Sequence, residues 1–170
     1  MKTRHLIPVL IGLAALLPSA LEANPIKSSN VFRGLEGKWK GSGELVDPEG
    51  NKSEVVETWT GKFTEEGNFV MSGTRKLGQM EHGFAWEFYA NGDLVEGQMK
   101  IEDPEIDARF EIVLDEEARS IKMTIPLSDS TMTIVNTVSK DGKTILGTVK
   151  IDDDSGNPGT TGEVKHEKQK

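Results

Sequence analysis

The run GFAWEFYANGDLVEGQMKI, residues 83–101, contains a pattern that recurs through most of the chain. Large apolar side chains alternate with polar ones on both sides of Asn91-Gly92. Alternation with a period of two indicates strands that bury one face, and Asn-Gly is a strong hairpin signal because a type I′ turn needs positive φ twice. We therefore expect a hairpin here. The pairs expected from this turn are Ala90–Asp93, Phe88–Val95, Trp86–Gly97 and Phe84–Met99.

The same alternation extends in both directions from this hairpin. Strands are expected at residues 38–46, 53–63, 68–77, 83–90, 93–101, 107–115, 120–125, 131–139, 143–151 and 160–167. Because every connection is short, neighbouring strands should pair antiparallel. Strands with one apolar face most simply close into a barrel, which removes exposed edges. The predicted fold is all-β: one antiparallel up-and-down barrel of about ten strands, with a short helical turn near residues 30–36.

Two further hairpins test the registers of this barrel. A turn at Asp141-Gly142 predicts the pairs Val138–Ile145, Asn136–Gly147, Ile134–Val149 and Met132–Ile151. The sixth and seventh strands are expected to align Leu114–Ile121, Ile112–Met123 and Phe110–Ile125. A slip of one residue would turn each apolar set to the wrong face, so the agreement favours these registers.

The N-terminal region has the layout of a secretory signal peptide. Lys2 and Arg4 precede an apolar run over residues 6–17, which is too short to span a bilayer, and a small residue, Ala23, follows. We expect cleavage after Ala23 and a periplasmic or secreted protein with no membrane span. The expected organisation is a signal peptide at 1–23, an N-terminal segment at 24–36 and a barrel at 37–168.

Composition narrows the class of protein further. The 170 residues carry a net charge of −8, which argues against binding to nucleic acid or to an anionic membrane surface. The absence of cysteine excludes disulfides, thiolate catalysis and cysteine-ligated metals. No catalytic motif or metal-binding spacing stands out, so we expect neither an enzyme nor a metal or cofactor site. A monomer is expected.

The start of the first expected strand resembles a known superfamily. It reads Gly37-Lys38-Trp39-Lys40-Gly41-Ser42-Gly43-Glu44. This is similar to the Gly-x-Trp start of lipocalins and fatty-acid-binding proteins. Its Trp-x-Gly-x-Gly extension resembles bacterial lipocalin-like (calycin-type) domains of unknown function and, more distantly, nitrobindin-type haem barrels. The resemblance implies a barrel that encloses a ligand.

A charged pair is expected inside this barrel. Pairing of the first three strands places Trp39 opposite Trp59, and Gly41, Glu57 and Arg75 in one interior layer. Charges on an apolar face are costly unless they are matched. Either Arg75 presents its planar guanidinium to the head group of a ligand, or Glu57 and Arg75 form an internal ion pair with Arg75 stacked on a tryptophan. We favour the ion pair.

Three other interior candidates have two interpretations each. Asn136 lines a cavity or bonds a buried water, and water is favoured. The stripe formed by Phe84, Trp86 and Phe88 stacks on a ligand or simply belongs to the core, and the core is favoured. In nitrobindin-like barrels the haem ligand is a histidine on the last strand, a position that His166 matches. We favour a solvated terminal His166, and a solvated His82 in the loop before the fourth strand.

These observations leave three functions open. The first is an exported, non-catalytic barrel that binds a small hydrophobic or amphipathic ligand, with Trp39, Glu57, Trp59, Arg75, Trp86 and Asn136 as the interior binding residues. The second is a solidly packed structural or interaction module without a ligand. The third, resting on His166 alone, is a haem-binding barrel.

Overall fold

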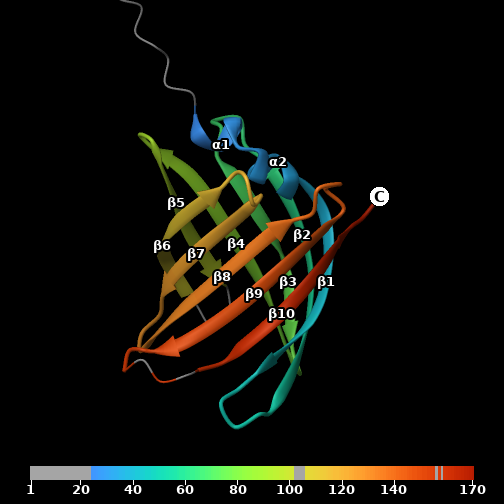
Figure 1. Ribbon diagram of the computed structural model, residues 1–170, viewed down its shortest axis with the longest axis vertical. Helices are drawn as coiled ribbons and strands as arrows, with labels where there is room; N and C mark the ends of the chain where they lie inside the picture. The colour runs from blue at the N-terminus through green and yellow to red at the C-terminus, as the bar shows by residue number, and fades with distance from the viewer. Residues whose placement is uncertain (1–23, 102–105, 156, 158) are drawn as a thin grey trace, which may run out of the picture.

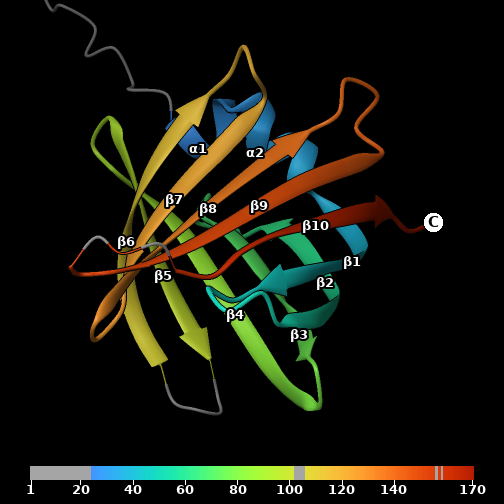
Figure 2. The same cartoon turned by 60° about the horizontal axis from the view of Figure 1, so that its bottom comes forward.

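The computed structural model describes residues 24–101, 106–155, 157 and 159–170. These residues form a closed antiparallel barrel whose ten strands follow one another in chain order, with β1 pairing with β10 (Figures 1 and 2). The helices are α1 (Pro25–Ser28) and α2 (Asn30–Leu35). The strands are β1 (Gly37–Val46), β2 (Lys52–Phe63), β3 (Phe69–Leu77), β4 (Met80–Asn91), β5 (Leu94–Ile101), β6 (Ile106–Asp115), β7 (Ser120–Pro126), β8 (Ser130–Val138), β9 (Thr144–Asp153) and β10 (Thr161–Lys168). The predicted fold class is confirmed.

Most of the expected registers are confirmed. β1 and β2 pair Trp39 with Trp59, and β2 and β3 pair Glu57 with Arg75. All four pairs predicted around Asp141-Gly142 occur between β8 and β9. Between β6 and β7 the pairs Ile112–Met123 and Leu114–Ile121 occur, but the pairing ends at Glu111–Thr124 and does not include Phe110–Ile125.

The register at Asn91-Gly92 was predicted wrongly. β4 and β5 pair Ala90–Val95, Phe88–Gly97, Trp86–Met99 and Phe84–Ile101. Asn91 pairs with Leu94, so the turn residues are Gly92 and Asp93, and Gly92 has the positive φ of 60°. A shift of two residues keeps every side chain on its expected face. The aromatic stripe therefore still points inward.

The two helices close one end of the barrel. Ser29 caps α2 by accepting hydrogen bonds from the backbone N–H groups of Val31 and Phe32, and it donates to Glu116 of the β6–β7 turn. The ring of Phe32 is fully buried and lies 5.2 Å from that of Phe69 and 5.3 Å from that of Phe88, measured between centroids. Among the described residues, no helix covers the other end of the barrel (Figure 1).

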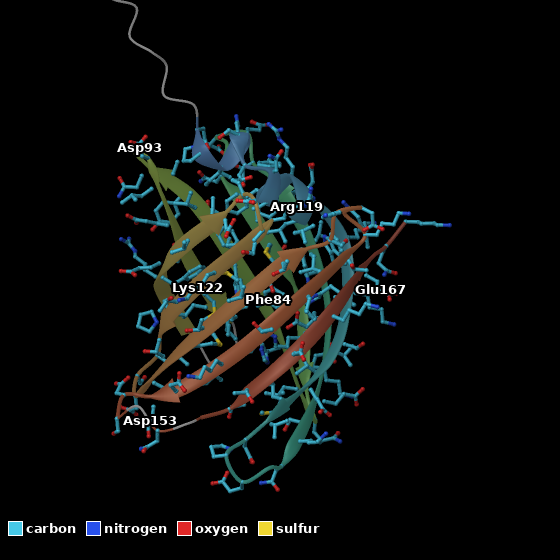
Figure 3. The ribbon with its side chains drawn as sticks, in the orientation of Figure 1. Phe84, Asp93, Arg119, Lys122, Asp153 and Glu167 are labelled. Carbon is cyan, nitrogen blue, oxygen red and sulfur yellow. The ribbon has the colours of Figure 1, made fainter. Side chains whose placement is uncertain are left out.

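The barrel has an apolar inside and a charged outside. Charged residues such as Lys122 and Glu167 project outward, whereas Phe84 lies within the barrel (Figure 3). Among the described residues, no helix is long and apolar enough to cross a membrane. The expected signal peptide, residues 1–23, lies outside the described residues.

Candidate functional site

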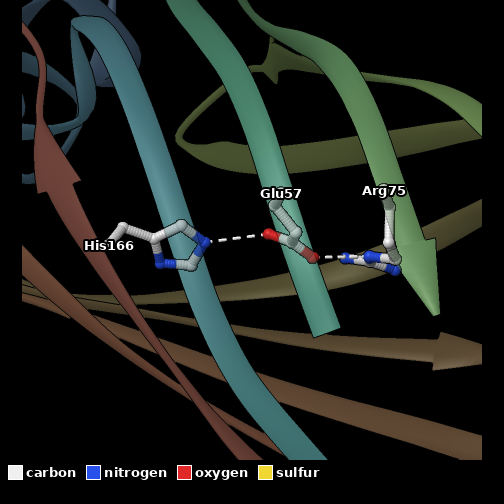
Figure 4. Close-up of polar contacts among 3 residues, drawn as sticks. All are labelled: Glu57, Arg75 and His166. Carbon is white, nitrogen blue, oxygen red and sulfur yellow. Dashed lines mark hydrogen bonds and ion pairs between the residues drawn. The ribbon is translucent and has the colours of Figure 1, made fainter. Parts of the chain in front are cut away.

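Four strands bring three polar side chains together inside the barrel. β1 lies between β10 and β2, and its Gly41 is paired with His166 on one side and Glu57 on the other. A Cβ on Gly41 would lie only 2.3 Å from Cδ2 of His166. The missing side chain therefore lets the imidazole ring lie over β1 and reach Glu57 (Figure 4). Arg75 approaches the same carboxylate from β3.

The carboxylate of Glu57 joins the other two side chains. Its Oε2 lies 2.8 Å from Nε2 of His166, and its Oε1 accepts a hydrogen bond of 2.5 Å from Nε of Arg75. Glu57 is 6% exposed and His166 is 4% exposed. An ionised carboxylate only accepts hydrogen bonds, so Nε2 of His166 is the donor. The predicted Glu57–Arg75 pair is confirmed, and His166 extends it to a triad.

The triad keeps Glu57 ionised despite its burial. Burial raises the pKa of a carboxyl because it penalises the charged form. Here the charge of Arg75 and the hydrogen bond from His166 outweigh burial and lower the pKa of Glu57 from 4.5 to about 2. Glu57 is therefore a carboxylate at neutral pH, and it is the fixed negative charge of the site.

The guanidinium of Arg75 has N–H donors that no described residue accepts from. Its carbon Cζ lies 5.4 Å from the centre of the Phe84 ring and 5.9 Å from that of Trp86, which fits the predicted stacking. Within the described part of the chain its one hydrogen bond runs through Nε. The two terminal nitrogens thus remain available to an acceptor.

Two cavities meet at this arginine. The inner chamber has a volume of about 30 Å³ and is bordered by Arg75, Trp86, Asn136, Gly147 and His166, among others. The outer cavity has a volume of about 270 Å³, and its lining includes Leu45, Leu77 and Ile101, which lie at or near the ends of β1, β3 and β5. These strand ends are the ones away from the helices. The apolar walls of the outer cavity also include Val55, Leu127 and Met132. Glu57 and Arg75 border both spaces.

The expectation that the two histidines are solvated is wrong. His166 points inward because it shares the parity of Val164 on β10, and Gly41 gives its ring space. His82 lies in β4, not in a loop, and is half-buried opposite Arg75, where it borders the outer cavity. The high charge of the last strand misled the interpretation of His166, since those charges belong to the outward face.

His166 does not fit the role of a haem ligand. Its Nε2 is engaged by Glu57, and its ring packs edge-on against Trp59 with centroids 5.6 Å apart. The inner chamber beside the ring, at about 30 Å³, has room for about one or two water molecules, not for a macrocycle. The described residues therefore do not form a haem site.

The other predicted interior residues divide into two groups. Trp59, Trp86 and Asn136 border the inner chamber together with the triad. Trp39 belongs instead to the closed end, where its Nε1 donates to the carbonyl of Leu35 and its ring stacks on Trp59. Sequence reasoning missed the outer cavity, although the predicted interior pairs included four of its lining residues: Met132, Ile134, Val149 and Ile151.

Comparisons with known proteins support the fold. No protein-family model matches the sequence, and no curated protein matches it. Among solved structures, the S-type phycobiliprotein lyase CPES from Guillardia theta is similar at 8% identity with a TM-score of 0.61, over 86% of this chain and 96% of that one. Rv2717c from M. tuberculosis is similar at 12% identity with a TM-score of 0.58, over 84% of this chain and 99% of that one.

A third similar structure is a protein of unknown function of the DUF3598 family from Nostoc punctiforme PCC 73102. The identity is 12% and the TM-score 0.56, over 81% of this chain, which spans about half (49%) of that longer chain. At such identities the likeness concerns the fold alone. The fold is thus a closed antiparallel β-barrel of ten strands with a polar site in its interior, and no family is assigned.

The expectation that the chain is not an enzyme has to be corrected. One of the similar barrels is a phycobiliprotein lyase, so this architecture also occurs in proteins with an enzymatic role. The lack of a familiar catalytic motif was therefore too weak a basis for excluding catalysis.

Proposed function

We propose that the protein binds a small amphipathic ligand with an anionic head group inside the barrel. The observation that carries this proposal is the position of Arg75, whose terminal guanidinium nitrogens lie unbonded within the described structure at the junction of the two cavities. A planar pair of N–H donors in a largely apolar space suits a carboxylate.

The outer cavity suits the apolar part of such a ligand. Its volume of about 270 Å³ is nearly twice that of the engineered cavity of about 150 Å³ that binds benzene. A chain of about ten non-hydrogen atoms, such as octanoate, is an appropriate probe. A cavity of this size also argues against the alternative of a solidly packed module.

The charges of the triad are compatible with an anionic ligand. Glu57 is bonded only to Nε of Arg75, so the N–H groups of the two terminal nitrogens are left for a second carboxylate. The Arg75 side chain is only 20% exposed, so a hydrogen bond between these charged groups is stronger there than at the surface.

Octanoate should bind, and 1-octanol should bind at least tenfold more weakly. A hydrogen bond to a charged group contributes about 1.5–3 kcal/mol, which corresponds to about ten- to a hundredfold in affinity. The Arg75→Met variant should lose this difference, whereas Arg109→Met, an exposed arginine on β6, should keep it. Isothermal titration calorimetry measures both constants, and equal binding of the two probes by the wild type would refute the anionic preference.

We also propose that the protein is exported and cleaved before Asn24. Asn24 caps α1 by accepting hydrogen bonds from the backbone N–H groups of Ile26 and Lys27, so a chain that starts there keeps its helix cap. Native mass spectrometry of the periplasmic and secreted fractions should give the monomer mass of residues 24–170. A full-length mass confined to the cytoplasm would contradict export.

A further inference from the structure

Asn136 is a buried polar residue that the triad does not use. It is 6% exposed, faces the barrel interior from β8 and borders the inner chamber. Its side-chain amide makes no hydrogen bond to another described residue, whereas most buried amides do. An unpaired buried amide costs free energy, so a polar group that enters the chamber and bonds it is favoured.

Gly147 leaves space in front of this amide. The two residues are paired between β8 and β9, and a Cβ on Gly147 would lie 2.7 Å from Oδ1 of Asn136 and 3.7 Å from Cε1 of His166. Any side chain at position 147 would thus take up part of the inner chamber. Gly147 does not have a positive φ, so its backbone conformation does not require glycine. What requires glycine is the space in front of the Asn136 amide, which a side chain would occupy.

Two residues that border the chamber also carry unpaired polar atoms. Nδ1 of His166 and Nε1 of Trp86 are buried and have no hydrogen-bond partner among the described residues. The inner chamber is bordered mostly by apolar side chains, but Arg75, Asn136 and His166 also border it. Its volume of about 30 Å³ suits one group of about the size of a water molecule, whereas the outer cavity is much larger.

We propose that the inner chamber receives a hydroxyl group of the ligand, and that the preferred ligand is a short hydroxylated carboxylate. This inference rests on the proposed function, because Arg75 must hold the carboxylate. Arg75 borders both spaces, so a carboxylate at its terminal nitrogens lies at the mouth of the chamber. A hydroxyl one or two carbons away would then enter the chamber that Asn136 also borders, and its amide both donates and accepts hydrogen bonds.

The test compares octanoate with 2-hydroxyoctanoate and 3-hydroxyoctanoate by isothermal titration calorimetry. One added hydrogen bond should make at least one hydroxy acid bind about fivefold tighter than octanoate. Gly147→Ala, whose methyl group takes up the space against Oδ1 of Asn136, and Asn136→Leu, which removes the amide, should each bring this ratio of dissociation constants to about one. Thr148→Ala, on the outer face of β9 beside Gly147, should leave the ratio unchanged.

The outcomes separate the two proposals. If octanoate binds and neither hydroxy acid binds more tightly, the hydroxyl site is refuted and the anionic ligand site stands. A preference that persists in both Gly147→Ala and Asn136→Leu also refutes the hydroxyl site. If none of the three acids binds the wild type, the proposed function fails and this inference fails with it.

Discussion

Replacing Glu57 by glutamine is expected to destabilise the barrel by about 3–5 kcal/mol at pH 7. The carboxylate is the common acceptor for Arg75 and His166, and its side chain is only 7% exposed. A glutamine of the same shape has one acceptor oxygen, so its amide NH₂ would face one of the two donors. It would also leave the charge of Arg75 without a counter-ion. Urea unfolding followed by tryptophan fluorescence measures the loss.

The pH dependence of the same variant checks the cause. The pKa of Glu57 is about 2 in the folded protein and 4.5 when unperturbed, so the folded state binds the proton less readily. The resulting stability is present above pH 4.5 and is lost as the pH falls towards 2, a change of about 3 kcal/mol. The difference in free energy of unfolding between the wild type and Glu57→Gln should therefore become smaller as the pH falls from 4.5 towards 2.

A matched control is available on β10. Glu167 follows His166 on β10, and its side chain is 67% exposed. Glu167→Gln should change the free energy of unfolding by no more than about 0.5 kcal/mol. If Glu57→Gln were as mild as this control at pH 7, the buried carboxylate could not be the ionised centre of the triad.

Replacing Phe32 by alanine should cost about 3–5 kcal/mol of stability. Its ring is fully buried and contacts the rings of Phe69 and Phe88, so it ties α2 to the barrel wall. Truncation leaves a cavity at the closed end, and the short helix α2 has little stability without tertiary packing. Urea unfolding measures the loss, and increased binding of a hydrophobic dye would report the opened end.

Asn30→Ala provides the comparison for this helix. Asn30 begins α2 and is exposed, and its side chain makes no hydrogen bond to another described residue. The substitution should therefore change stability by about 0.5 kcal/mol or less. If Phe32→Ala and Asn30→Ala lowered the free energy of unfolding equally, packing of the Phe32 ring could not be what holds α2 over this end of the barrel.

The fold was predictable because alternation and turn residues carry most of its information. Asp141-Gly142 led to the correct β8–β9 register, and the layer of Gly41, Glu57 and Arg75 was also correct. Asn91-Gly92 led to an error of two residues, because the residues of the turn itself are Gly92 and Asp93. Each side chain of the hairpin still lies on the predicted face of the sheet, since a shift of two residues does not change the face.

The site was predictable only in part. Glu57 and Arg75 are neighbours on hairpin-connected strands, so local pairing was enough to bring them together. His166 lies 109 positions from Glu57, and the contact depends on barrel closure between β1 and β10. Its parity with Val164 placed His166 on the inner face, but the charges around it in the terminal strand outweighed that signal in the prediction.

By itself, the sequence determined which face of each strand is buried, because the hydrophobic effect acts on the side-chain period of two. It also determined that a charged pair lies on the inner face. Only the tertiary structure decided what that pair does: closure placed His166 on Glu57, Gly41 and Gly147 left space for polar groups, and the helices closed one end of the barrel. Such contacts depend on the three-dimensional spacing of distant strands, which a one-dimensional pattern does not contain.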